Sequence, residues 1–500
     1  MSNLGGYKTH CHLRLFQKLF RQTFVYGLAT VLPRMLSFLL VPLYTDVMQA
    51  DTYGTLTIIF TFFALFNVVL AYGMETAFFR FYALEADKER VLSTSLITLL
   101  ISTMVFLLLG WIFRTPLAGI LNIEPTYFTH FLAILALDAL VIVPFARLRA
   151  IEKPGKYALI KIANVTINIF LNLLFLLLLP AWLAKGTQVA GNAPGNPAQQ
   201  IQYILMAMSA SSAFTLLLLA ETYYKSKWRF DFALARRMLG YGFPVMIAGI
   251  AFTVNEVFDK YLLSELLPMQ SSMAKAEVGK YAACYKLAMF MTLFATAFRL
   301  GIEPFFFAHA SSKNPKITYA HITRFFVIFG SIILLTVIVF SDLIKTLIIR
   351  DPVFWEAMDV VPIVLTASLF LGIYHNLSVW YKITDRTRFG AVISLIGAGL
   401  TLGINVVFIP VYGYMASAWA TLAAYGSMMI LSYILGQRYY PIPYNTSIMF
   451  FYLGLSLLFS ILSFYVFNRD LFIGLTLLVV FLTIIYMRER KELTQLIRSK

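Results

Sequence analysis

The first long apolar run of the chain, QTFVYGLATVLPRMLSFLLVPLYTDVM from Gln22 to Met48, decides the fold. It is long enough to cross a hydrocarbon core of about 30 Å as a helix, and Arg34 lies about 18 Å from its start, near mid-membrane. A guanidinium at this depth costs about 2.5 to 3.5 kcal/mol, so Arg34 is expected to face water or a protein partner. Pro33 and Pro42 remove backbone donors and loosen the helix around it. We therefore predict that this helix lines a polar chamber walled by other helices.

The composition of the chain is that of a membrane protein. Of its 500 residues, 60% are hydrophobic and 13% are charged, and the mean hydropathy is +0.78, far from the balance of a soluble domain. The two cysteines, Cys11 and Cys284, lie before the first span and inside a later helix, so neither a disulfide nor a thiolate metal site is expected. The sequence holds no metal-ligand spacing, nucleophile and base arrangement or phosphate-binding loop. We therefore predict a protein that is not an enzyme and uses no metal or cofactor.

Apolar runs of membrane-spanning length recur along the whole chain. They predict an all-α polytopic membrane protein with about fourteen transmembrane helices. Before them, residues 1–21 are predicted to form a cytoplasmic amphipathic segment that lies in the headgroup region. The predicted spans are 22–46, 54–78, 91–113, 127–146, 157–181, 201–223, 238–262, 279–305, 323–341, 356–380, 389–410, 413–435, 446–467 and 470–487.

Lysines and arginines are distributed unevenly among the connections. With the N-terminus inside, about 29 of the 40 fall at the termini and in even-numbered connections, Lys161 among them, and about 7 fall in odd-numbered ones. Positive charge marks the cytoplasmic side, so both termini are predicted to be cytoplasmic. Most of the net charge of +16 is then a topology signal, and no nucleic acid partner is expected.

The chain repeats itself at about half its length. GMETAFFR from Gly73 is similar to GIEPFFF from Gly301, 228 positions later, and Asn172-Leu-Leu-Phe is similar to Asn405-Val-Val-Phe, 233 positions later. Six spans separate equivalent helices, so the halves have the same orientation, as in the parallel repeats of secondary transporters with a site at their junction. The repeat predicts two pseudo-symmetric six-helix lobes, followed by two helices and a basic cytoplasmic tail. The corresponding ranges are 22–223 for the N-lobe, 224–435 for the C-lobe and 436–500 for the C-terminal part.

Several motifs together resemble the oligosaccharide flippases of bacterial polysaccharide export, within the multidrug/oligosaccharidyl-lipid/polysaccharide exporter superfamily. The resemblance covers nearly the whole chain and rests on the order and spacing of motifs that are individually loose. The family usually has Asp-Arg where this chain has Asp259-Lys260, which keeps a cation but loses the fork geometry of arginine. The residues that carry the resemblance are PRMLSFLLVPLYT from Pro33, DTYG from Asp51, YGFP from Tyr241, Asp259-Lys260, VGKY from Val278, YKLA from Tyr285 and TDRT from Thr384.

The resemblance implies two lobes in a V around a central cationic chamber. It implies alternating access that carries a polyprenyl-diphosphate-linked oligosaccharide from the inner to the outer leaflet of the bacterial cytoplasmic membrane. The implied partners of this multi-pass protein, which we expect to be a monomer, are membrane lipids, the lipid-linked glycan and other membrane proteins of polysaccharide assembly. The charge of such a substrate agrees with a cationic chamber. A hydrated anionic head crosses hydrocarbon only where fixed cations and hydrogen-bond donors line a water-filled cleft.

Six polar side chains within the predicted spans are candidates for substrate binding: Arg34, Lys286, Arg299, Asn164, Asn168 and Asn172. Arg34 either contacts the diphosphate or pairs with a carboxylate such as Asp138 in the fourth span. Lys286 lies about 10 Å below the outer end of the eighth span and Arg299 near its inner end, so each either enters the cavity or snorkels to the interface. The three asparagines are spaced by four on one helix face, where they either form interhelical hydrogen bonds or contact sugar.

Six charged side chains are candidates for gating or ion coupling: Glu75, Asp138, Glu256, Asp259, Lys260 and Glu303. Glu75 and Glu303 are equivalent by the repeat and lie at inner helix ends, where they form a gate or an ion pair or are simply exposed. Asp138 is interpreted as a pairing or gating group, an ion-coupling group or an incidental packing group. Glu256 and Lys260 share one helical face four residues apart, which favours an intrahelical pair. His375 is interpreted as a satisfied interior histidine, with a proton relay as the alternative.

Two functions of other classes stay open. A cation-coupled multidrug antiporter of the same superfamily would hold a carboxylate cluster deep in one lobe and have about twelve spans. A membrane-embedded glycan polymerase or ligase would need long outer loops with catalytic arginine or histidine, and the outer connections are short and poor in both. The flippase is the prediction that the charges and the span count favour.

Overall fold

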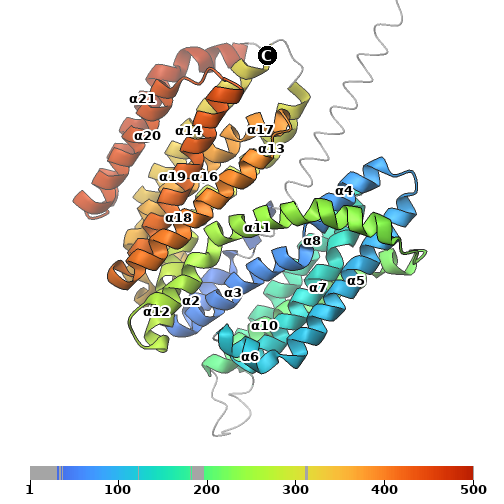
Figure 1. Cartoon of the computed structure of the whole chain (residues 1–500). Coiled ribbons are helices and arrows are strands. Elements are labelled where there is room, and N and C mark those ends of the chain that lie inside the picture. Colours follow the sequence, from blue (N-terminus) through green and yellow to red (C-terminus); the bar gives the residue numbers. More distant parts are fainter. Residues whose placement is uncertain are drawn as a thin grey trace, which may run out of the picture. The chain divides into compact units, whose positions relative to one another are not determined.

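The computed structural model describes residues 31–32, 35–36, 38–121, 123–180, 182, 196–309 and 314–498 (Figure 1). Throughout these ranges the regular elements are helices, and no strand occurs among them. The expected all-α fold is therefore confirmed. The predicted amphipathic segment 1–21 and the centre of the first span, with Pro33 and Arg34, lie outside the described residues.

Thirteen helices in the described ranges are long and apolar enough to cross a membrane. They match the second to the fourteenth predicted spans, with ends that differ by several residues. Residues 22–30, 33–34 and 37 of the first predicted span, 22–46, lie outside the described part, and the last turns of this span form α2 (Leu40–Val47). The plan of about fourteen helices is consistent with this result.

The chain divides into two compact units, Met1–Gly279 and Lys280–Lys500. The lobe boundary predicted at 223 from the repeat remains a prediction. The first unit contains α3 (Ala50–Ala71), α4 (Met74–Leu84), α5 (Lys88–Ile112), α6 (Arg114–Ile120), α7 (Pro125–Ala150), α8 (Pro154–Leu173), the π-helical turn η1 (Leu174–Leu178), α10 (Pro197–Tyr224), α11 (Phe232–Leu266) and the start of α12 (Ser271–Tyr285).

The second unit contains the end of α12 and the remaining helices. Among its spans, residues 352–383 form the central one, because 89% of the apolar window there is buried, compared with 17% for residues 154–178 of the first unit. The elements are η2 (Lys286–Ala288), α13 (Met289–His309), α14 (Pro315–Val339), α15 (Ser341–Ile348), η3 (Pro352–Val360), α16 (Val361–Leu377), α17 (Val379–Ile383), α18 (Arg388–Tyr412), α19 (Tyr414–Tyr439), α20 (Thr446–Ile461), η4 (Leu462–Val466) and α21 (Leu471–Arg498).

Local sequence explains where the helices begin. Proline occupies the first turn of α7, α8, α10 and α14, where its missing N–H is not needed and its fixed φ suits a helix. Side-chain caps start others: the Asp87 carboxylate accepts from the Arg90 N–H of α5, and the Asp231 carboxylate accepts from the Leu234 N–H of α11, each at 3.0 Å. These signals agree with the hydropathy pattern, so span positions could be predicted from sequence.

A break divides the second predicted span into α3 and α4. Tyr72 (φ 31°) and Gly73 (φ 72°) both adopt left-handed backbone conformations, which glycine tolerates and which stop α3. Helix α4 then places Glu75 in its first turn. The break therefore fixes where this carboxylate lies at the predicted inner end of the span.

The two C-terminal helices of the second unit pack against α14. Tyr452 of α20 and Phe481 of α21 are fully buried with Leu335 of α14 in one apolar cluster. Inside the same bundle, Arg324 of α14 and Glu489 of α21 form an ion pair of 2.5 Å, and the Tyr452 hydroxyl donates to Glu489 at 2.7 Å. These helices, predicted to lie outside the repeat, are therefore joined to it by apolar packing and by a buried polar triad.

Candidate functional site

Two ion pairs occupy equivalent positions of the repeat. In the first unit, Arg149 Nη1 of α7 lies 2.6 Å from Glu75 Oε1 of α4. In the second unit, Lys382 Nζ of α17 lies 2.7 Å from Glu303 Oε1 of α13. Glu303 follows Glu75 by 228 positions and Lys382 follows Arg149 by 233, the offsets of the sequence repeat. The repeat therefore extends to the charge partners, which sequence analysis had counted only as topology signals.

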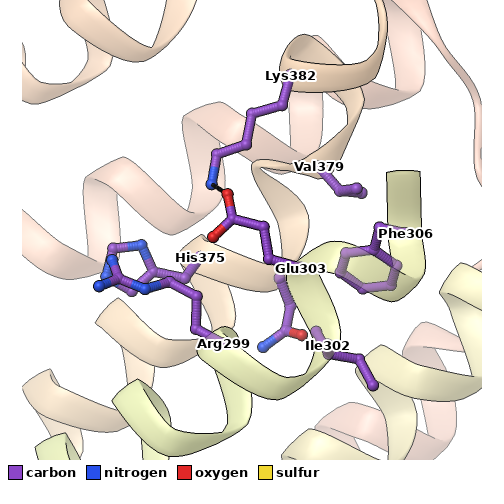
Figure 2. A pocket seen from close by; sticks show the side chains of 8 residues that line it. Arg299, Ile302, Glu303, Phe306, His375, Val379 and Lys382 are labelled. Carbon is purple, nitrogen blue, oxygen red and sulfur yellow. Dashed lines mark hydrogen bonds and ion pairs between the residues drawn. The ribbon is translucent and has the colours of Figure 1, made fainter. Parts of the chain in front are cut away.

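The Glu303 pair borders a small polar cavity in the second unit (Figure 2). Figure 2 shows Lys382 reaching Glu303, with the Arg299 and His375 side chains next to each other. Arg299, His375 and Lys382 are close enough to interact electrostatically, and the cavity of about 10 Å³ is about the size of one water molecule. Asn376, 4% exposed, also lines it. Arg299 therefore faces a cavity inside the protein, one of its two predicted environments.

A second polar cluster lies inside the first unit around Asp138 of α7. Its carboxylate accepts a hydrogen bond of 2.8 Å from Ser212 of α10, and it also interacts with Asn67 of α3 and Lys161 of α8. Lys161 Nζ lies over the Phe145 ring, 4.2 Å from its centroid. The charge count had placed Lys161 in a cytoplasmic connection, but α8 begins at Pro154, so this lysine belongs to the helix and its charge faces the cluster.

The asparagine stripe of α8 makes hydrogen bonds within the bundle. Asn164 Nδ2 donates to the Ser211 carbonyl oxygen at 3.0 Å and to Thr215 Oγ1 at 2.9 Å, and Asn168 Nδ2 donates to Ser211 Oγ at 3.4 Å, all on α10. Interhelical hydrogen bonding, one of the two predicted roles, is thus present, and contact with sugar stays a prediction.

Asn172 and its repeat equivalent Asn405 share one bonding pattern. Each is fully buried and donates to the carbonyl oxygen four residues before it, at 2.8 Å for Asn172 and 2.7 Å for Asn405. Each also accepts a hydroxyl hydrogen bond, Asn172 from Tyr44 of α2 and Asn405 from Ser417 of α19. The similarity of the two sequence segments therefore reflects the same local structure in both units.

Helix α11 carries the remaining candidates of the first unit. Lys260 Nζ lies 2.8 Å from Asp259 Oδ1, and the two side chains are 9% and 1% exposed. The structure thus gives Lys260 an ion pair with its neighbour Asp259, and the pair with Glu256 stays a prediction. A lysine pairs with an adjacent residue on a helix only by folding back along the helix surface.

Lys286 begins the 3₁₀ turn η2, which separates α12 from α13. Its side chain is half-buried. A short 3₁₀ stretch in the middle of a span often marks a hinge. The structure thus places this predicted substrate-binding lysine at a change of helix type, and Arg34, the other predicted mid-span cation, lies outside the described residues.

Charged groups held in internal clusters of long apolar helices define a polytopic helical membrane transporter. The profile described as polysaccharide biosynthesis protein matches residues 19–299, more than half of the chain. The chain belongs to the polysaccharide biosynthesis protein family. The MatE profile also matches, over residues 244–411. The resemblance to the exporter superfamily inferred from sequence motifs is therefore confirmed, and the matches are to transporters rather than to enzymes.

Solved transporter structures share the fold of this chain. The structure described as lipid II flippase MurJ in an inward closed conformation has a TM-score of 0.72 and 14% identity, and the match covers 93% of this chain and 99% of that one. An inward-facing multidrug resistance MATE family transporter has a TM-score of 0.63 and 12% identity, with 83% and 94% covered. An outward-facing multidrug resistance MATE family transporter has a TM-score of 0.59 and 11% identity. That match covers 84% of this chain and 95% of the transporter. No curated protein sequence matches the chain.

Proposed function

We propose that this protein is a flippase that moves a polyprenyl-diphosphate-linked oligosaccharide from the cytoplasmic to the outer leaflet of a bacterial cytoplasmic membrane by alternating access. One observation carries the proposal: in a member of the polysaccharide biosynthesis family, several charged side chains of the spans gather in clusters inside the helical units. They include Asp138 with Lys161 in the first unit and Arg299 with Glu303 in the second. A charge is expensive in hydrocarbon, so such clusters mark a polar path through the membrane.

The head of the proposed substrate needs cations. Arg299 lines the polar cavity of the second unit, Lys286 lies at a helix break, and Arg34 is predicted at mid-membrane. Arginine binds phosphate oxygens through paired N–H groups, and lysine binds them as a point charge. We assign these three residues to the diphosphate and the part-buried amides of Asn164 and Asn168 to sugar hydroxyls. Asn172 is fully buried and its amide is bonded to Asn168 and Tyr44, so we leave it a structural role.

The tail of the proposed substrate needs an apolar site. The second unit has a cavity of about 320 Å³ among α14, α16, α19 and α20, lined by aliphatic and aromatic side chains such as Ile373, Met429 and Phe450. Cavities of this size and character bind hydrocarbon rather than water. A polyprenyl chain or a membrane lipid chain fits this description, which supports an amphiphilic substrate.

We assign the gating role to the two equivalent ion pairs. The side chains of Glu75 and Arg149 are 48% and 41% exposed, and those of Glu303 and Lys382 are 35% and 27% exposed. Part-exposed pairs contribute little to stability, about 0 to 1 kcal/mol each. Both lie at the predicted cytoplasmic ends of their spans. Such weak pairs suit a contact that forms and breaks in each cycle.

Charge reversal tests this role. We expect Glu303→Lys to lower glycan export severalfold, because it sets two lysines side by side, and Glu303→Lys with Lys382→Glu to restore most of it. The unfolding midpoint in detergent should change little in all variants, since the pair is part-exposed. Export is measured as glycan displayed on intact cells. Equal export by the single and the double variant would contradict a role for this pair.

Deletion of the gene tests the proposed function itself. Cells that lack the flippase are expected to accumulate the isoprenoid-linked glycan on the cytoplasmic side and to lose the corresponding surface glycan. Mass analysis of the lipid extract identifies the glycan, and a plasmid copy of the wild-type gene should reverse both effects. Unchanged lipid-linked glycan and unchanged surface glycan in the deletion strain would rule the proposal out.

A cation-coupled multidrug antiporter is the second candidate, favoured by the MatE profile match over residues 244–411. Asp138 would then be the coupling carboxylate, because it lies in a polar cluster inside the first unit. In that case Asp138→Asn would abolish efflux of cationic dyes from loaded cells, and surface glycan would stay normal. The flippase proposal expects the reverse pattern in the deletion strain: lost glycan and unchanged dye efflux.

A further inference from the structure

Helix α3 touches α12 through a pair of glycines, Gly54 near the start of α3 and Gly279 near the middle of α12. A Cβ atom on Gly54 would overlap the Lys275 carbonyl oxygen, and one on Gly279 would overlap the Ala50 carbonyl oxygen. The two backbones are therefore in direct contact at this point. Transmembrane helices approach each other this closely only where small residues, above all glycine, lie at their interface.

The other end of α3 touches α11 through a second glycine pair. A Cβ on Gly242 would lie 2.5 Å from the Tyr72 carbonyl oxygen, and one on Gly73 would overlap the backbone of Gly242. Gly73 also has the left-handed backbone that ends α3. This contact, like the first, joins main chain to main chain.

The two contacts lie at opposite faces of the membrane. Gly54 and Gly73 are 19 positions apart, about 28 Å at a helical rise of about 1.5 Å, close to the thickness of a hydrocarbon core. The distribution of lysine and arginine predicts that Gly54 is near the outer face and Gly73 near the cytoplasmic face. All four glycines lie in the unit Met1–Gly279.

Between the glycine pairs α3 stays in contact with α11, and Figure 1 shows the two helices side by side. Thr61 Oγ1 donates to the Val257 carbonyl oxygen at 3.3 Å, and the Phe62 and Tyr261 rings lie 4.9 Å apart. Closer to the cytoplasmic end, Val68 faces Gly249. The seam that α3 makes with α11 and α12 is therefore closed along its length in this structure.

Main-chain contacts differ from ordinary side-chain packing in how they respond to change. A side chain near a new methyl group can change rotamer, as Leu132 could beside Gly110, but a backbone carbonyl can move only with its helix. Close packing makes such interfaces open or closed rather than continuously adjustable. A methyl group at either glycine pair would therefore displace one helix from the other at that end.

We propose that the Gly54–Gly279 contact closes the outer gate and the Gly73–Gly242 contact closes the inner gate, and that one opens while the other stays closed. This inference rests on the alternating access of the proposed function. The sequence repeat assigns α3 to the first six spans and α11 with α12 to the second six, so the seam between them is where the two repeats would part. Each glycine pair then sets the side from which the substrate path is reached.

Thiol labelling tests the two gates separately. In a chain with Cys11→Ser and Cys284→Ala, a reporter cysteine is placed by Ala50→Cys at the outer contact or by Val68→Cys near the inner one. A membrane-impermeant maleimide is applied to intact cells for the first reporter and to inside-out vesicles for the second. We expect Gly54→Ala to raise labelling of the outer reporter about tenfold and Gly242→Ala to raise labelling of the inner reporter about tenfold, through a shift in the population of open states.

The chain provides matched controls. For Gly240 of α11 and Gly403 of α18, an added Cβ meets no neighbouring atom within 4 Å in the described part of the chain, so Gly240→Ala and Gly403→Ala raise helix propensity equally without a new contact there. If Gly54→Ala fails to fold, Gly279→Ala alters the same contact from the other helix. Labelling equal to that of the controls, or a rise at both ends in one variant, would overturn the inference. Labelling needs no substrate, so a deletion strain without a glycan defect would reject the proposed function and leave this result standing.

Discussion

Arg34→Ala is expected to reduce glycan export to the background of the deletion strain. We propose Arg34 as the cation that meets the diphosphate of the substrate after this head leaves the interface, because its predicted position is at mid-membrane. Loss of one partner of a desolvated charge pair costs about 2 to 5 kcal/mol, at least about thirtyfold in binding. Arg34→Lys keeps the charge but loses the paired N–H groups, so we expect partial export. Export is measured as surface glycan in the deletion strain that carries each variant.

Arg114→Ala is the matched control for this experiment. It also removes one arginine, but Arg114 begins the short helix α6, where its guanidinium lies over the Trp111 ring, 5.2 Å from the centroid. We expect normal export from this variant. Protein level and membrane insertion of both variants are followed by immunoblot of washed membranes. Normal surface glycan in Arg34→Ala at wild-type protein level would contradict the role of Arg34.

Glu489→Gln is expected to cause the largest loss of stability among single changes in the second unit. Arg324 and Glu489 are 11% and 4% exposed and lie 2.5 Å apart, and Tyr452 donates to the same carboxylate. Glu489→Gln breaks this buried ion pair by removing one of its charges, and such a change costs about 3 to 5 kcal/mol of unfolding free energy. We expect a clear fall in the thermal unfolding midpoint of the purified protein in detergent.

Two further variants separate the charge effect from loss of packing. Arg324→Met with Glu489→Leu removes both charges and keeps similar volume, so it should recover most of the stability lost in the single variant. Arg488→Gln removes the neighbouring exposed arginine, which lies over the Phe451 ring at 4.1 Å, and should cost at most about 1 kcal/mol. Equal midpoints for Glu489→Gln and Arg488→Gln would show that the buried pair does not hold α21 in place.

Part of the site could be predicted from single residues. A carboxylate, lysine or arginine inside an apolar run is unusual enough to identify Asp138, Lys260 and Arg299 without coordinates. The repeat also linked Glu75 to Glu303. Applied to the basic residues, the same offset would have linked Arg149 to Lys382, but these were counted only for topology. The equivalence of these residues was thus present in the sequence, but the pairing of each carboxylate with its cation was not.

Other parts of the site had no such signal. Lys161 falls inside the predicted span 157–181 although its charge was counted with the preceding connection. Its place beside Asp138 depends on how α7 and α8 pack. Gly54 and Gly240 look alike in sequence, yet Gly54 touches a neighbouring backbone, whereas a Cβ on Gly240 would meet nothing within 4 Å among the described residues. A glycine in the sequence shows that a neighbouring helix can approach closely at that position. It does not show whether a helix does so.

The amino-acid sequence by itself determined that this protein is helical, where thirteen of its spans lie and that it repeats, and it predicts that the basic connections are cytoplasmic. These properties follow from the thickness of the hydrocarbon core and the cost of charge within it, and both act on each segment separately. Only the tertiary structure decided which charge meets which, which asparagine bonds to which helix and which glycines touch. Those depend on distances between helices far apart in the chain, and no local pattern records such distances.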